Sequence, residues 1–146
     1  MRDRDQGLYR VLDANFNRAK EGLRVCEEIT RFILNSTALT ARLKRCRHRI
    51  DSLTRSLPGR RRLFAERDSG RDVGLKVKQK SEFKRNGFKD IFFANIQRVK
   101  ESIRVLEEFA KLDDVAAALG FRNLRYEIYE LEKDVSTKLA SACRRR

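Results

Sequence analysis

The stretch ANFNRAKEGLRVCEE, at residues 14–28, recurs as ANIQRVKESIRVLEE at residues 94–108. Nine of the fifteen aligned positions are identical at an offset of 80 residues, which is well beyond chance for unrelated segments. A weaker repeat follows, because LKRCRHRIDSL from residue 43 aligns with FRNLRYEIYEL from residue 121. The chain therefore contains a duplicated unit, and each copy has two segments.

Apolar residues recur in both copies with the period of an α-helix. In the first copy they gather on one side of a helical wheel at Leu12, Phe16, Ala19, Leu23, Cys26, Ile29, Thr30 and Ile33. In the second copy the stripe is Ile96, Val99, Ile103, Leu106, Phe109 and Ala110. Each copy is therefore predicted to begin with an amphipathic helix.

The spacing predicts four helices, at about 7–34, 38–57, 88–112 and 121–142. Pro58 and Gly59 end the second helix, and residues 58–87 form a long, charged connection. Two antiparallel helix pairs with related sequences predict an all-α four-helix bundle with approximate internal twofold symmetry. We expect residues 1–146 to form one helical domain, with a first helix pair at about 7–57 and a second at about 88–142.

Composition supports a folded helical domain and excludes two other classes. Hydrophobic residues make up 40% of the 146 residues and charged residues 38%, which matches neither a disordered tail nor a membrane protein. One Pro and seven Gly favour long helices over a many-stranded sandwich. No apolar stretch approaches the roughly 18 residues of a membrane-spanning helix. We therefore expect a cytoplasmic protein with no membrane partner.

The net charge of +14 predicts attraction to polyanions, without identifying them. The excess is concentrated in residues 42–62, where nine Lys and Arg accompany a single acid, Asp51. A basic module for RNA or DNA is one interpretation and a solvated helix face is the other. Nucleic acid is the less favoured partner, because the stretch has no recognisable nucleic-acid motif and no interleaved aromatic residues. Three widely spaced cysteines, Cys26, Cys46 and Cys143, predict buried reduced thiols.

Polar residues within the apolar stripes are the main functional signal. Asn15 and Arg18, and their copies Asn95 and Arg98, lie within the apolar arc of the wheel, while Glu21 and Glu101 lie at its edge. A buried guanidinium without a partner costs several kcal/mol, so these arginines require carboxylates, backbone oxygens or an anionic ligand. One interpretation is an internal ion-pair network that fixes the bundle register. The other is a polar cavity between the first and third helices, lined by these six side chains.

A second signal is the segment RDSGRDVG at residues 67–74. Its glycines let backbone amides approach an anion, Arg67 and Arg71 can pair with phosphate, and Asp68 and Asp72 can hold Mg²⁺. A polar surface turn is the alternative, because Asp and Gly are common turn residues. The chain lacks the phosphate-binding loop signature and the dinucleotide fingerprint. A carboxylate-bridged metal pair is disfavoured, because such sites use Glu-x-x-His on two helices and His48 is the chain's one histidine.

The sequence resembles the compact helical hydroxymethylpyrimidine phosphate kinase domain of thiamin biosynthesis, which is often fused ahead of a thiamin phosphate synthase. The resemblance rests on LYRVLDANFNRAKEGLRVCEE from residue 8 with the following RFIL, on RDSGRDVG, on ANIQRVKESIRVLEE and on LRYEIYELEK from residue 124. It implies transfer of the γ-phosphoryl group of ATP, with Mg²⁺, to the phosphate of hydroxymethylpyrimidine phosphate. A phosphorylated pyrimidine, a nucleotide and a separate thiamin phosphate synthase are then the expected partners, and a homodimer is compatible.

Phosphoryl transfer requires positioning and charge neutralisation, and this suggests a role for each candidate residue. Arg18 and Arg98 are expected to clamp phosphates, with Glu21 and Glu101 holding them in place. The connection would contribute metal ligands, Asp68 and Asp72, and a pair that steadies the transferring group, Arg67 and Arg71. Asn15 and Asn95 would orient the pyrimidine or a phosphate, and Tyr126 or Tyr129 would stack on the pyrimidine. A catalytically silent partner of the synthase is the alternative function.

Overall fold

The computed structural model describes residues 2–77 and 83–143, and only the backbone of residues 2–4. Its four long helices are α1 (Arg2–Glu28), α2 (Thr37–Ser56), α4 (Phe88–Ala110) and α5 (Val115–Cys143). The connection between α2 and α4 contains the short helix α3 (Arg60–Ala65) and the 3₁₀ turns η2 (Ser69–Arg71) and η3 (Val73–Lys76). The described residues contain no strand, so the predicted all-α class is confirmed.

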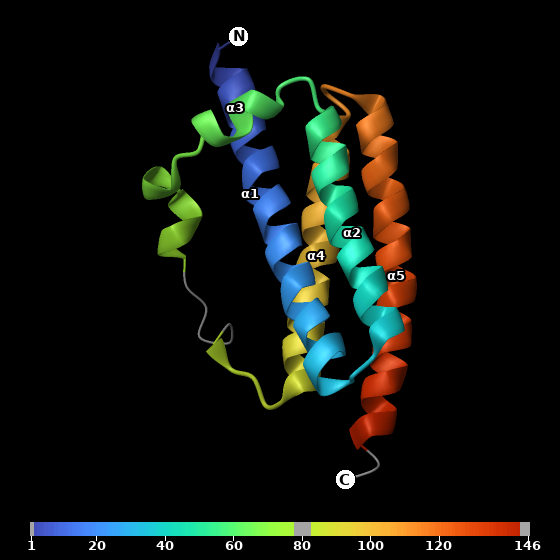
Figure 1. Cartoon of the computed structure of the whole chain (residues 1–146). Helices are drawn as coiled ribbons and strands as arrows, with labels where there is room; N and C mark the ends of the chain where they lie inside the picture. The colour runs from blue at the N-terminus through green and yellow to red at the C-terminus, as the bar shows by residue number, and fades with distance from the viewer. Residues whose placement is uncertain (1, 78–82, 144–146) are drawn as a thin grey trace.

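The long helices form a four-helix bundle in which each helix packs against two others. α1 packs against α2 and α4, and α5 packs against the same two helices. Figure 1 shows α1 and α5 running down the bundle while α2 and α4 run up it, so that neighbours are antiparallel. Each predicted helix pair is thus a hairpin, and the two hairpins pack together through α1 against α4 and α2 against α5. Twofold symmetry of the whole bundle stays a prediction.

The predicted apolar stripes supply part of the core, and α2 and α5 supply much of the rest. Fully buried side chains come from all four long helices and include Leu12, Leu23, Leu43, Ile50, Phe92, Ile96, Ile103, Leu106, Phe121, Leu124, Ile128 and Leu131. Each such side chain contributes about 1.5–3 kcal/mol by leaving water. Ile33 and Phe109 depart from their stripes, since each is 37% exposed. Within the described parts of the chain, no helix is long and apolar enough to cross a membrane.

A glycine permits the close approach of α1 to α4. A Cβ atom at Gly22 would lie 2.7 Å from Cγ2 of Val99 and 3.1 Å from the backbone oxygen of Asn95. Both distances are shorter than ordinary van der Waals contact, so the helices would have to separate to admit a side chain. The equivalent residue in the second copy, Ser102, is also small and is buried. Small residues at this crossing therefore bring the two copies of the repeat together.

The helix ends differ from the predicted bounds in three places. α1 begins at Arg2 rather than near residue 7, because nothing in the intervening sequence breaks a helix. After Glu28 it widens into a π-helical turn, η1 (Ile29–Ile33), and the chain reverses at Asn35, whose φ is 48°. Asparagine tolerates this left-handed conformation better than most residues. α5 begins at Val115 rather than residue 121, because Oδ1 of Asp114 accepts hydrogen bonds from the first amides of the helix.

The connection runs along the outer side of α1, from one end of the bundle to the other (Figure 1). Helix α3 and the two 3₁₀ turns were not predicted, because their sequences are too short to show a period. Several contacts tie this segment to α1: the Arg67 guanidinium binds the Asp13 carboxylate, Arg10 donates to the carbonyl oxygen of Asp68, and Arg62 of α3 lies over the Tyr9 ring. Residues 78–82 of the predicted connection lie outside the described residues.

Candidate functional site

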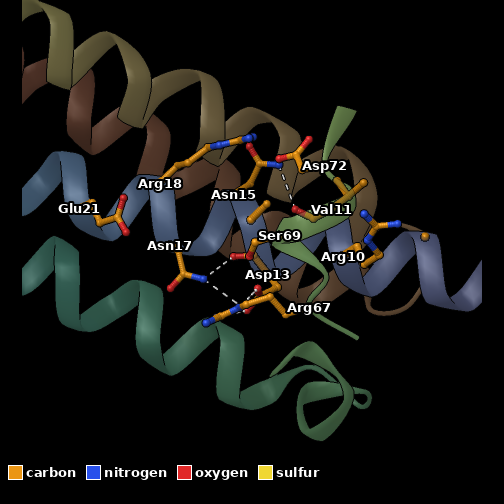
Figure 2. Close-up of a pocket in the computed structure, with 12 residues that line it drawn as sticks. Arg10, Val11, Asp13, Asn15, Asn17, Arg18, Glu21, Arg67, Ser69 and Asp72 are labelled. Carbon is orange, nitrogen blue, oxygen red and sulfur yellow. Dashed lines mark hydrogen bonds and ion pairs between the residues drawn. The ribbon is translucent and has the colours of Figure 1, made fainter. Parts of the chain in front are cut away.

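The larger polar groove lies between α1 and the connection and has a volume of about 660 Å³. Figure 2 shows its wall from α1 together with Arg67, Ser69 and Asp72 from the connection. The α1 residues that line this groove, called here the α1 groove, are Gly7, Arg10, Val11, Asp13, Ala14, Asn15, Asn17, Arg18 and Glu21. Three predicted binding residues and two predicted catalytic residues thus meet in one place.

A smaller groove of about 380 Å³ lies on α4. Its lining residues, which define the α4 groove, are Phe83, Arg85, Ala94, Asn95, Gln97, Arg98 and Glu101. The five from α4 occupy the same repeat positions as Ala14, Asn15, Asn17, Arg18 and Glu21 of the α1 groove. Spacings of three, four and seven residues place each set on one face of its helix. The expected single cavity is therefore wrong: the six predicted residues line two related grooves, three in each.

The two groove arginines are exposed, not buried in the bundle as the helical wheel suggested. Arg18 and Arg98 form no ion pair with any described residue. They were predicted to lie within the apolar arc, but a long side chain near the limit of such an arc can carry its guanidinium into solvent. In Figure 2 the Arg18 side chain extends toward the side of the groove where Asp72 lies. Both guanidinium groups are therefore available to an anion.

The groove glutamates do not hold these arginines, contrary to the prediction. Glu21 makes no ion pair within the described residues, and Glu101 accepts a hydrogen bond from Nε2 of Gln97 at 3.0 Å. Both carboxylates are exposed on the groove walls. They add negative charge beside the arginines and can accept hydrogen bonds from a ligand.

The groove asparagines are fixed by their own helices. Nδ2 of Asn15 donates to the carbonyl oxygen of Val11 at 2.9 Å, and Nδ2 of Asn95 donates to that of Ile91 at 2.8 Å. Asn15 is buried and Asn95 is half-buried. With the amide nitrogen held in this way, each side chain can offer its oxygen as an acceptor to a ligand.

Arg67 anchors the connection to α1 through a two-pronged ion pair. Its Nε and Nη2 atoms lie 2.7 and 2.8 Å from the two carboxylate oxygens of Asp13. The Asp13 side chain is 9% exposed, and its hydrogen bonds raise the pKa of Arg67 above the ordinary value. Sequence reasoning missed Asp13, because it lies outside the predicted apolar stripe and its position there gave no sign that it would be buried. Arg67 therefore positions the groove wall and has little capacity left for a second anion.

The remaining residues of the RDSGRDVG segment shape its turns. Oδ1 of Asp68 accepts from the Arg71 amide at 3.3 Å, and its Oδ2 lies 3.6 Å from Nε of Arg71. Oδ1 of Asp72 accepts from the Gly74 amide at 2.9 Å. Asp72 lines the α1 groove, whereas Asp68 and Arg71 are not among its lining residues. These hydrogen bonds are those of a polar turn, which was the alternative interpretation of this segment. Asp72 nevertheless lines the α1 groove.

The described residues contain no cluster of three or more His, Cys, Asp or Glu that could hold a metal ion by itself. Mg²⁺ in phosphoryl-transfer sites usually takes only one or two carboxylates, together with substrate phosphates. Asp72 fits such a role, because it lines the groove and uses only Oδ1 for the Gly74 amide. Asp68 fits less well, since both of its oxygens face Arg71.

The internal ion-pair network considered from the sequence exists, but at other residues. Glu27, expected on the polar face, is buried and binds Nε of Arg47 at 3.0 Å. Its repeat equivalent, Glu107, is also buried and binds Nη2 of Arg125 at 2.9 Å. Each glutamate lies near a second arginine from its own helix, Arg24 or Arg104. We call these two clusters the buried glutamate centres.

Part of the basic excess on α2 is used within the bundle. Arg42 pairs with Asp134 at 2.6 Å and Arg49 with Glu127 at 3.0 Å, both on α5. Burial raises the pKa of Cys26 and Cys46 to about 12, as expected for inert core thiols. Cys143 is exposed, so the prediction of buried cysteines is wrong for the third.

These features define a class: a small helical-bundle protein with two related, arginine-bearing grooves built from a duplicated helix. The chain belongs to the ThiD2 family, which it matches over residues 10–134. Similar curated proteins are thiamine-phosphate synthases of Nostoc punctiforme, 38% identical over 89% of this chain, and Rhodopirellula baltica, 40% identical over 91%. The chain covers 36% and 35% of their lengths, so it spans about a third of these relatives. No solved structure matches it significantly.

Proposed function

We propose that this chain acts in thiamin biosynthesis as a hydroxymethylpyrimidine phosphate kinase that uses Mg-ATP. Membership of the ThiD2 family and the names of the curated relatives support the pathway. The kinase activity is supported by the resemblance drawn from the sequence and by one structural observation. That observation is a pair of grooves, each with an arginine that has no partner among the described residues. Two grooves that can each bind an anion suit a reaction that joins two phosphorylated substrates.

The grooves are close enough in the fold to serve one reaction. Gly22 follows Glu21 of the α1 groove, and it packs against the backbone oxygen of Asn95 in the α4 groove. The same connection borders both grooves, through residues 67–72 and 83–85. Substrates bound on either side of the α1–α4 contact would therefore be neighbours.

The reaction requires little covalent participation by the protein. The bond between the γ-phosphorus and the β–γ bridging oxygen breaks, and ADP leaves with the electron pair. An oxygen of the acceptor phosphate, already ionised, forms the new bond to phosphorus and gives the pyrophosphate. Catalysis then rests on bringing two anions together and neutralising their charge.

The chain's own residues can provide this positioning. Arg18 and Arg98 would each bind a phosphate, and Asn15 and Asn95 would present fixed amide oxygens. Mg²⁺ bound with the nucleotide would neutralise phosphate charge, with Asp72 as the carboxylate best placed to hold it. Arg67 acts indirectly, because its ion pair with Asp13 holds the connection against α1.

The kinase assay uses the full chain with Mg-ATP and hydroxymethylpyrimidine phosphate. We expect stoichiometric ADP and pyrimidine pyrophosphate, measured by chromatography and ³¹P NMR. Arg18→Ala and Arg98→Ala should each lower kcat/KM roughly 10- to 100-fold, because each removes a charge-assisted hydrogen bond. Arg45→Ala, which removes an exposed charge from α2 outside both grooves, is the matched control. Absence of ADP at saturating substrates would exclude the kinase function.

A second candidate is a non-catalytic partner of thiamine-phosphate synthase. The observation that favours it is that the curated relatives carry that name and are about three times as long as the matched region. Sedimentation of the purified chain with a separate thiamine-phosphate synthase tests it. A stable complex without ADP formation would support the partner function. ADP formation without a complex would support the kinase.

A further inference from the structure

The two grooves share an Asn, an Arg and a Glu, but they differ in what surrounds these residues. The α1 groove is the larger, at about 660 Å³ against about 380 Å³, and it adds Arg10, Ser69 and Asp72. The α4 groove has a glutamine, Gln97, at the repeat position of Asn17, hydrogen-bonded to Glu101, and it adds Phe83 and Arg85. These additions favour different ligands.

The additions in the α1 groove suit a polyphosphate carrying a metal ion. Arg10 donates to the carbonyl oxygen of Asp68 at 3.4 Å and forms no ion pair with a described residue, so it joins Arg18 as a second available cation. Guanidinium groups bind phosphate oxygens strongly, and two of them can bridge successive phosphates. Ser69 offers a hydroxyl group, and Asp72 a carboxylate for the cation that accompanies a triphosphate.

The additions in the α4 groove suit an aminopyrimidine. Nε2 of Gln97 lies 3.0 Å from Oε1 of Glu101, so an amide donor and a carboxylate acceptor stand side by side on one exposed wall. The hydroxymethylpyrimidine of thiamin has the complementary edge, an exocyclic amino group next to a ring nitrogen. The amino group can donate to Glu101 while the ring nitrogen accepts from Gln97. Arg98, which forms no ion pair with a described residue, can bind the phosphate of such a ligand.

An aromatic ring lies beside the same wall. Gln97 and Glu101 also line a neighbouring depression of about 440 Å³ with Lys100, Arg104, Arg125 and Tyr129. The Tyr129 side chain is 41% exposed and lies next to Tyr126, with 6.1 Å between ring centroids. Bases stack on exposed aromatic side chains of this kind in single-stranded nucleic acid complexes. The lining residues of the α1 groove include no aromatic side chain.

We infer that the duplicated grooves have divided the two substrates between them. The α1 groove binds the nucleoside triphosphate with its metal ion, and the α4 groove binds the aminopyrimidine monophosphate. This assignment rests on the proposed kinase function for the identity of the ligands. It goes further by giving each copy of the repeat its own ligand.

Binding of each ligand alone tests the assignment without relying on turnover. Isothermal titration of the full chain uses Mg²⁺ with β,γ-imido-ATP in one series and hydroxymethylpyrimidine phosphate in the other. Arg18→Ala should lower the affinity for the nucleotide analogue at least about tenfold and change the affinity for hydroxymethylpyrimidine phosphate less than about twofold. Glu101→Ala should do the reverse. Both positions are exposed, so the folded state should tolerate either change, which circular dichroism can verify.

A pyrimidine phosphate without the exocyclic amino group sharpens the test. The wild-type chain should bind it at least about tenfold more weakly than the natural ligand, because Glu101 loses its donor. In Glu101→Ala the two compounds should bind about equally. Arg45→Ala should leave every affinity unchanged and so controls for net charge.

The outcomes separate this inference from the kinase function. Reversed or equal effects of Arg18→Ala and Glu101→Ala would overturn the assignment while leaving ADP formation intact. Selective effects without ADP formation would uphold the assignment as binding and exclude the kinase. Failure of the wild-type chain to bind either ligand would overturn the assignment outright.

Discussion

The grooves and the buried glutamate centres are both products of the same duplication, yet they differ in burial and pairing. Glu27 and Glu107 have side chains only 4% and 5% exposed, and each is neutralised by arginines. Arg18 and Arg98, two to three turns earlier on the same helices, are exposed and form no ion pair with the described residues. Repetition of a charged residue is therefore no guide to its role. A saturated, buried charge stabilises the bundle, whereas an unsaturated charge on a groove wall is available to a ligand.

The largest effect on stability should come from opening a buried glutamate centre. Arg125→Ala removes the main partner of Glu107 and leaves that carboxylate buried, which should lower the free energy of unfolding by about 3 kcal/mol. Arg42→Ala breaks a more exposed ion pair with Asp134 and should cost less than about 1 kcal/mol. Urea denaturation measures both. Similar small losses in the two variants would remove the contrast between buried and exposed pairs.

A smaller loss is expected where the two copies meet. Gly22→Ala introduces a methyl group against Val99 and the backbone of Asn95, and it should destabilise the chain by about 1–3 kcal/mol. It should also weaken turnover, because it separates the grooves. Gly7→Ala is the matched control: nothing lies within 4 Å of its Cβ position, and alanine should stabilise the exposed helix by up to about 1 kcal/mol. Thermal unfolding of the two variants should shift in opposite directions.

The smallest effect on stability is expected in the grooves themselves. Arg18→Ala and Arg98→Ala should each change the free energy of unfolding by less than about 0.5 kcal/mol, because both side chains are exposed and unpaired. Urea denaturation should show this even where kcat/KM falls. A loss above about 1 kcal/mol in either variant would assign the arginine to the structure instead of the ligand.

Helical periodicity was enough to predict the bundle, its two hairpins and much of the core that α1 and α4 supply. It also predicted that Asn15, Arg18 and Glu21 share one helix face and that their copies share another, since spacings of three and four residues define such a face, but it placed both sets in a single cavity. It placed Arg18 inside the apolar arc and Glu27 on the polar face, and both were wrong, because the direction of a side chain also depends on where the neighbouring helices and the connection lie. Asp13 was missed for the same reason: its partner, Arg67, comes from a segment without periodicity.

The connection is much longer than its covalent task requires. α4 has 23 residues, so the bundle is about 35 Å tall, and about ten extended residues would bridge that height. The chain uses residues 57–87 instead. A shortened linker that kept both hairpins joined would preserve the bundle and its core. It would, however, remove Ser69 and Asp72 from the α1 groove, and the α4 groove would keep only the residues from α4. The extra residues of the connection therefore serve ligand binding, whereas the bundle can fold without them.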